Sequence, residues 1–161
     1  MPVSVIAGPA AEFHQNTGFL EKLVSDIAPE HWVSRPDDRG NHIAWIVGHV
    51  VWARKALITR LGATWDQPGL DVFARSAKLE ESLSYPAPEA LLAAWRESAV
   101  ALTSAIESVT AEALAAPAPK GPPSPDGKLS GFVGVLSWHE TYHVGQISYL
   151  RGWLGYKGMM G

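Results

Sequence analysis

Apolar residues recur at intervals of three and four in four long stretches of the chain. This spacing places them on one face of a helix, and it predicts helices over about residues 9–27, 42–61, 88–115 and 130–155. No stretch alternates apolar and polar residues between hairpin turns, as a half-buried strand would. Four amphipathic helices without strands predict an all-α fold, an antiparallel four-helix bundle.

The ends of these helices are marked by residues with known positional preferences. Pro9 suits a first helical turn, and Pro29 ends the first helix, after which a polar loop carries Trp32. Asn41 and Ser130 are residue types that cap helices, so we expect them to begin the second and fourth helices.

Two connections interrupt the helical pattern. Residues 62–88 form a segment longer than compact domains usually leave irregular, so we expect a short helical piece within Asp71 to Ser82. Residues 116–129 hold five prolines and two glycines, which predicts a surface connection between helices. With 161 residues and no repeat, residues 1–161 are expected to form one domain.

Composition and charge exclude several classes of function. Thirteen basic and 16 acidic residues give a net charge of −3, which does not favour nucleic acid as a partner. No apolar segment approaches the length of a membrane span, and no leader pattern opens the chain, so a cytoplasmic location is expected. The chain has no cysteine, so any thiol chemistry would need a thiol from outside.

The motif His139-Glu140-Thr141-Tyr142-His143 is the sharpest chemical feature of the sequence. Two histidines four residues apart lie about 40° apart around a helix and about 6 Å along it, so both rings can bind one cation. His49 lies on the apolar face of the second helix and can supply a third ring. Three neutral imidazoles leave an open position on a divalent metal such as Zn²⁺ or Ni²⁺.

The remaining histidines do not fit this cluster. His42 lies about 10.5 Å along the helix from His49, too far to share one metal. His14 and His31 have no partner at ligand spacing and are expected at surface or helix-end positions. A single histidine on an apolar face is usually a hydrogen-bonded core residue, but three converging rings would be costly to bury without a metal.

The same motif also matches the HExxH pattern of metalloproteases, in which Glu140 would activate water. The absence of a predicted strand and of a third ligand after His143 disfavours that interpretation. Glu140 lies about 80° from the direction midway between the two histidines. It either orients a neighbouring ring or is a solvated residue on the helix face.

Several segments together resemble one known family, the DinB-like (YfiT-like) superfamily of metal-dependent four-helix bundles. They are Trp32, Arg35-Pro36, residues 41–49, residues 139–147 and Tyr149-Leu150-Arg151. The resemblance implies that His49, His139 and His143 bind zinc or nickel. It also implies a thiol-dependent S-transferase or isomerase that uses an external low-molecular-weight thiol such as bacillithiol or mycothiol, acts on a small molecule and forms homodimers.

This resemblance leaves parts of the site open. The sequence shows no basic cluster for holding an acidic thiol. Arg54, Arg75 and Arg151 are only loose candidates, and we expect each to be an exposed charge. Trp45 and Trp52 flank His49 at helical spacing and are candidates for pocket walls, although most tryptophans belong to the core.

Two further expectations complete the sequence-based picture. The C-terminal residues 156–161 are expected to fray. The alternatives to an S-transferase are a non-catalytic bundle that binds metal for stability and, less favoured, a metallohydrolase with Glu140 as base.

Overall fold

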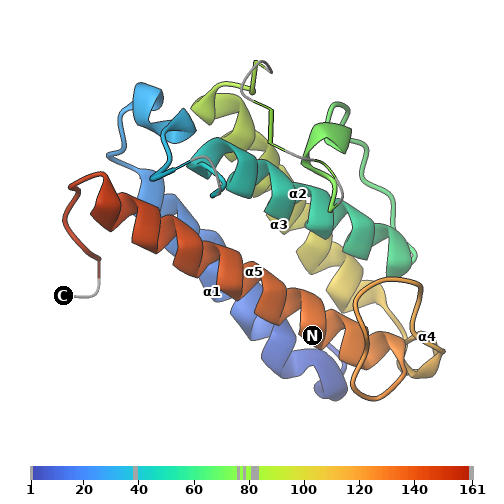
Figure 1. The fold of residues 1–161 in the computed structure, drawn as a ribbon. Helices are drawn as coiled ribbons and strands as arrows, with labels where there is room; N and C mark the ends of the chain where they lie inside the picture. The colour runs from blue at the N-terminus through green and yellow to red at the C-terminus, as the bar shows by residue number, and fades with distance from the viewer. Residues whose placement is uncertain (1, 38–39, 76, 78, 81–83, 160–161) are drawn as a thin grey trace.

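The computed structural model describes residues 2–37, 40–75, 77, 79–80 and 84–159, and almost all of its regular structure is helical (Figure 1). The long helices are α1 (Ala7–Val24), α2 (Ile43–Arg60), α3 (Pro88–Ser108) and α5 (Leu129–Trp153), and α4 (Ala111–Ala115) is short. The described residues also include the short 3₁₀-helices η1 (Ser4–Ile6), η2 (Pro29–Val33) and η3 (Asp71–Phe73). The described residues contain no strand, only an isolated bridge between Pro117 and Lys128.

The four long helices pack as the predicted bundle. Each contacts two neighbours, in the order α1, α5, α2, α3 and back to α1, and Figure 1 shows α5 running beside α1 and α2 beside α3. Helix α2 is the most enclosed of them, because 13 of its 18 residues are buried. Polar side chains on the inner face of α2 must therefore find partners inside the protein.

The predicted helix boundaries need two corrections. The first helix runs from Ala7 to Val24 rather than to residue 27. The predicted helix 88–115 is two helices, because the backbone is extended at Val109 and Thr110. The Thr110 side chain accepts a hydrogen bond from the backbone N–H of Ala113, so it caps α4 and separates it from α3.

The predicted caps are also wrong by a residue or two. His42, not Asn41, caps α2, and its Nδ1 accepts a hydrogen bond of 3.1 Å from the Trp45 N–H. At α5 the flanking residue is Lys128, and Ser130 lies in the first turn. The Asp126 carboxylate accepts from the Lys128 N–H and from the Ser124 and Ser130 hydroxyls, and these bonds lower the pKa of Asp126 to about 2.

In the long connection 62–88, the helical piece predicted over 71–82 shortens to η3, with residues 76, 78 and 81–83 outside the described residues. η3 is anchored by Phe73, which is fully buried against Gly48. A Cβ at Gly48 would lie 2.5 Å from the Phe73 ring, so glycine is required there for η3 to approach α2.

The C-terminal segment is docked rather than frayed at residues 156–157. The Tyr156 hydroxyl accepts from the Ala28 N–H at 2.9 Å and lies 2.8 Å from Nδ1 of His31. The backbone carbonyl of Lys157 accepts from Arg151. Residues 160–161 lie outside the described residues. No described helix is both long and apolar enough to cross a bilayer.

Candidate metal centre

The structure brings His49 of α2 together with His139 and His143 of α5. One nitrogen from each ring lies within 4.8 Å of the other two. Nε2 of His139 is 3.3 Å from Nε2 of His49 and 3.1 Å from Nε2 of His143. The packing of α5 on α2 therefore directs three ring nitrogens to one point.

Hydrogen bonds fix the orientation of two of these rings. Nδ1 of His49 donates to the backbone carbonyl of Phe73 at 2.7 Å, and Nδ1 of His143 donates to the Gln146 side-chain oxygen at 2.7 Å. A neutral imidazole that donates from Nδ1 carries a lone pair on Nε2. Both rings therefore present a lone pair to Nε2 of His139.

His139 cannot satisfy both neighbours by itself. Its Nε2 carries at most one proton, so at least one of the two close approaches brings lone pairs together. Its Nδ1 is buried and has no hydrogen-bond partner among the described residues. If Nδ1 holds the proton, all three lone pairs converge. A cation at their centre removes this repulsion, so the donor set fits a divalent metal.

The distances between the ring nitrogens also fit a bound zinc ion. Zinc–nitrogen bonds of about 2.0–2.1 Å place tetrahedral ligand atoms about 3.3 Å apart. The two short N···N distances of 3.3 and 3.1 Å are close to this value. Both zinc and nickel accept neutral imidazole nitrogens.

Electrostatics keeps the three rings neutral. Burial, and after it the charge of neighbouring imidazoles, lowers the pKa of His139 and of His143 to about 4. Burial also lowers the pKa of His49. At neutral pH the rings are therefore in the form that binds metal, with no proton to displace from Nε2 of His49 or His143.

Two tryptophans position the His49 ring. Trp45 stacks on it with ring centres 4.8 Å apart, and Trp52 stacks on it with centres 5.7 Å apart. The proximity expected from helical spacing is confirmed. Trp52 also lines a pocket beside the histidines, whereas Trp45 is buried in the core.

Glu140 points away from the cluster, although it follows His139 directly. It is buried, and both of its carboxylate oxygens accept from Arg54, at 2.7 and 2.9 Å. It is neither a solvated helix-face residue nor a hydrogen-bond partner of a histidine ring. One residue along α5 turns the side chain by about 100°, into the interior where Arg54 of α2 lies.

The expectation of exposed arginines is wrong at two of three positions. Arg54 is 1% exposed and also donates to Thr17 and the Phe13 carbonyl, with its guanidinium over the Trp95 ring. Arg151 is 3% exposed and pairs with Asp26. Arg75 is exposed as expected.

A pocket of about 320 Å³ opens beside His49 and His139. Three aromatic residues and three basic residues contribute to its lining: Trp52, Phe132, Trp138, Arg60, Arg75 and Lys120. Arg60 and Lys120 were not predicted as site residues from the sequence. No local signal marks them, because they are 60 residues apart and meet only when the connection before α5 folds back onto α2.

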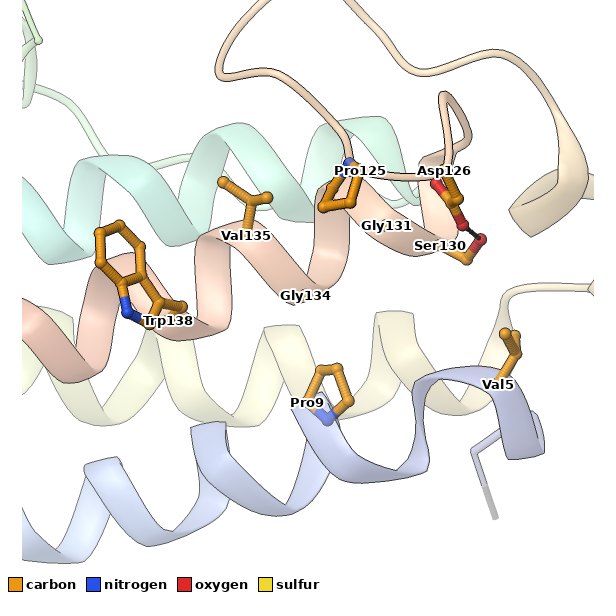
Figure 2. A pocket seen from close by; sticks show the side chains of 9 residues that line it. All are labelled: Val5, Pro9, Pro125, Asp126, Ser130, Gly131, Gly134, Val135 and Trp138. Carbon is orange, nitrogen blue, oxygen red and sulfur yellow. Dashed lines mark hydrogen bonds between the residues drawn. The ribbon is translucent and has the colours of Figure 1, made fainter.

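A second pocket, of about 450 Å³, lies where the start of α5 faces the start of α1 (Figure 2). Pro9 and Val5 form one side, Trp138 lies at one end, and the hydrogen-bonded pair Asp126 and Ser130 lies at the other. Its single carboxylate is already engaged in holding the start of α5. The pocket beside the histidines is therefore the better candidate for a ligand-binding site.

The other three histidines stay outside the cluster. His42 is buried at the start of α2, where its Nδ1 caps the helix and its ring contacts the Tyr85 ring. His14 is exposed on α1, and His31 lies at the end of η2 against Tyr156. These positions agree with the sequence-based expectations.

Helices α2 and α5 of this four-helix bundle direct three neutral histidines to one point, and a pocket lies beside them. These features define the class of the protein as a candidate metal-binding helical bundle. A comparison with protein-family models matches residues 12–147 to the DinB superfamily. The chain belongs to this superfamily. A search of curated proteins finds no match to the chain.

Proposed function

We propose that this protein is a metal-dependent enzyme that transfers or isomerises a small molecule with the help of an external low-molecular-weight thiol. The convergence of three Nε2 lone pairs beside a pocket carries this proposal. The family resemblance supplies the thiol-dependent S-transfer chemistry, and the chain has no cysteine of its own to provide the sulfur.

His49, His139 and His143 would hold the metal, which is zinc or nickel in this proposal. When bound, a divalent cation lowers the pKa of a thiol or water and polarises an electrophile. The three neutral rings leave the cation its full charge, and among the described residues no fourth side chain joins the group. The Phe73 carbonyl and Gln146 keep two rings oriented, while Trp52, Phe132 and Trp138 provide apolar walls for the adjoining space.

The pocket favours a catalytic role over a purely structural metal. A metal that only stabilised the bundle would not need space lined by residues other than its ligands. The hydrolase alternative is disfavoured because the carboxylate of Glu140 is held by Arg54. The proposal includes a cytoplasmic location and a homodimer, with neither nucleic acid nor membrane as partner.

The test measures the rate at which bacillithiol, mycothiol or glutathione reacts with the electrophile monochlorobimane. The rate is compared among the zinc-loaded, nickel-loaded and chelator-treated protein. We expect a metal-dependent acceleration with at least one thiol, lost in His139→Ala and retained in the exposed-histidine control His14→Ala. No acceleration with any thiol and metal combination would contradict the S-transferase proposal.

A further inference from the structure

Three cations from three separate segments surround the pocket beside the histidines. Arg60 lies at the end of α2, Arg75 follows η3, and Lys120 belongs to the connection before α5. Arg60 donates to the Lys120 carbonyl at 3.1 Å, which holds two of these segments together. Arg75 is close enough to His139 for its charge to help lower the pKa of that ring.

Within the described part of the chain, these charges have no carboxylate partner. None of the residues that line the pocket is aspartate or glutamate, and no ion pair joins the three cations to a described acidic residue. The pocket is therefore basic, although the net charge of the whole chain is −3. A concave site with one sign of charge concentrates ligands of the opposite sign.

The pocket walls define the rest of the ligand. Trp52, Phe132 and Trp138 provide apolar faces, and the volume of about 320 Å³ is at the small end of ligand pockets. The space therefore suits a compact molecule with an apolar part and a charged end.

We propose that this pocket binds the oxyanion of a small amphipathic ligand, a carboxylate or phosphate, through Arg60, Arg75 and Lys120. The apolar part of the ligand packs against the aromatic walls. The inference deepens the proposed function by assigning a charge class to the molecule that enters the site. The binding itself does not require the metal.

The test measures binding of benzoate, phenyl phosphate and uncharged benzamide to the metal-free protein by calorimetry. We expect an oxyanion to bind about tenfold or more tightly than benzamide, because charge-assisted hydrogen bonds are lost with the amide. The double variant Arg60→Gln/Arg75→Gln should lose at least about tenfold in affinity for the preferred oxyanion. Lys22→Gln removes a positive charge outside the pocket and should leave the affinity unchanged.

A further variant, His143→Ala, distinguishes a failure of the oxyanion-binding proposal from a failure of the proposed thiol-dependent function. His143→Ala removes a predicted ligand that does not line the pocket, so it should abolish thiol chemistry and keep oxyanion binding. Equal affinity for benzamide and both oxyanions, undetectable binding of both oxyanions, or unchanged affinity in the double arginine variant would overturn the pocket proposal.

A separate observation concerns the outer face of α5. Four aromatic side chains on it are exposed: Trp138 at 66%, Tyr142 at 54%, Tyr149 at 66% and Trp153 at 44%. At about 100° per residue they fall within about 60° of the helix circumference. The acidic and basic residues of α5, Glu140 and Arg151, are both buried. This exposed stripe therefore carries no charge, which is typical of an interface.

The spacing of the stripe is self-complementary. Trp138 and Trp153 are placed symmetrically about the point between Gly145 and Gln146, and so are Tyr142 and Tyr149. A second α5 packed antiparallel across a two-fold axis at that point would meet tryptophan with tryptophan and tyrosine with tyrosine. Such matching of one surface with itself is the requirement for a closed dimer.

The centre of the stripe leaves room for a neighbour. A Cβ at Gly145 would have no atom within 4 Å, and a hollow of about 440 Å³ lies over it between Trp138 and Tyr149. At about 200 Å² per aromatic side chain, the four exposed fractions total about 460 Å². This is more than half of the roughly 800 Å² that each partner contributes to a standard interface.

We propose that a second copy of this chain covers the aromatic stripe of α5. The interface then reaches the candidate metal centre, because Gln146 donates to the Tyr142 hydroxyl and accepts from Nδ1 of His143. The homodimer itself belongs to the proposed function, and the inference drawn here is the face of α5 through which it forms. A dimer that persists in Gly145→Glu would overturn this choice of face and leave the proposed function intact.

Sedimentation equilibrium tests the dimer, and Gly145→Glu is its most direct perturbation. The substitution fits the protomer and improves helix propensity, but it places two carboxylates near the two-fold axis. We expect a dimer for the native chain, a monomer for Gly145→Glu, and a dimer for the control Val100→Glu, which alters an equally exposed residue of α3.

Cysteine cross-linking tests the geometry, since the chain has no native cysteine. Gly145→Cys should form a disulfide between copies. Gly152→Cys, another glycine with open space around it, should not, because the two copies of that position would be about 20 Å apart. A native monomer, a dimeric Gly145→Glu variant, or equal cross-linking at both positions would overturn the proposal.

Discussion

Two polar clusters lie between α2 and α5, and they differ in how completely the protein satisfies them. In the first, Arg54 and Glu140 meet in a two-point ion pair, and the guanidinium also donates to Thr17 and the Phe13 carbonyl. In the second, three histidines direct Nε2 atoms at one another. The first cluster has its partners within the chain, whereas the second presents a donor set that fits a cation.

The contrast arises from one residue of helical register. His139 and Glu140 are neighbours in the sequence, but about 100° of rotation separates their side chains. One side chain reaches the pocket that holds Arg60, Arg75 and Lys120, and the other reaches the closed interior. Within the motif, the histidines therefore belong to the candidate metal centre, and we propose that the glutamate serves the stability of the bundle.

Breaking the closed cluster should have the largest effect on stability. Glu140→Gln leaves Arg54 buried without a counter-charge, so we expect a loss of about 3–5 kcal/mol in the free energy of unfolding, measured in urea. The control Glu21→Gln breaks the exposed pair with Arg96 and should cost less than about 1 kcal/mol. Metal content should stay unchanged in both variants. Loss of metal from Glu140→Gln with full stability would reverse our assignment.

Breaking the open cluster should affect metal affinity instead. His139→Ala or His49→Ala removes a ligand, and we expect metal affinity to fall by more than the roughly 10–100-fold cost of losing an outer partner. The measurement is competitive titration with a chromophoric chelator. His14→Ala should bind metal as the native protein does. Undiminished affinity in either ligand variant would contradict the three-histidine centre.

Acid should destabilise the metal-free protein through the same rings. The folded-state pKa values of His42, His139 and His143 are about 4, below the ordinary value of 6.5, so the unfolded chain binds more protons between these limits. The free energy of unfolding should therefore fall as pH drops from 6.5 toward 4, by up to about 1.4 kcal/mol per pH unit for each proton. The slope should be shallower in His139→Ala, and a flat profile would be inconsistent with buried neutral rings.

The smallest expected effect concerns the support of one ligand. Gln146→Ala removes the acceptor for Nδ1 of His143, so the ring loses its fixed orientation and tautomer. We expect metal affinity to fall about tenfold, with metal still bound at high concentration. The exposed residue Gln15 of α1 provides the control Gln15→Ala. Affinity equal to that of the control would show that Gln146 does not position the ring.

Local periodicity predicted the fold and the histidine triad well. The spacing of four between His139 and His143 is a property of one helix, and His49 was placed by the apolar face of another. The resemblance to the family was confirmed by the match over residues 12–147. These features depend on short segments, so the sequence alone reveals them.

Features that depend on long-range packing were missed. The partnership of Arg54 with Glu140 spans 86 residues and requires the exact register of α2 on α5. The cap by His42 was missed because Asn41 is the better cap on propensity alone. The helix break at Thr110 was missed because helical apolar spacing continues up to Val109. The basic lining of the pocket depends on loops, whose course the apolar pattern does not encode.

X-ray absorption spectroscopy of the metal-loaded protein tests the central claim most directly. Our account predicts three imidazole nitrogens at the metal, one or more exchangeable light ligands, and a sulfur neighbour after addition of a low-molecular-weight thiol. Fewer than three imidazoles, or a fourth ligand from the protein that no added thiol displaces, would contradict it.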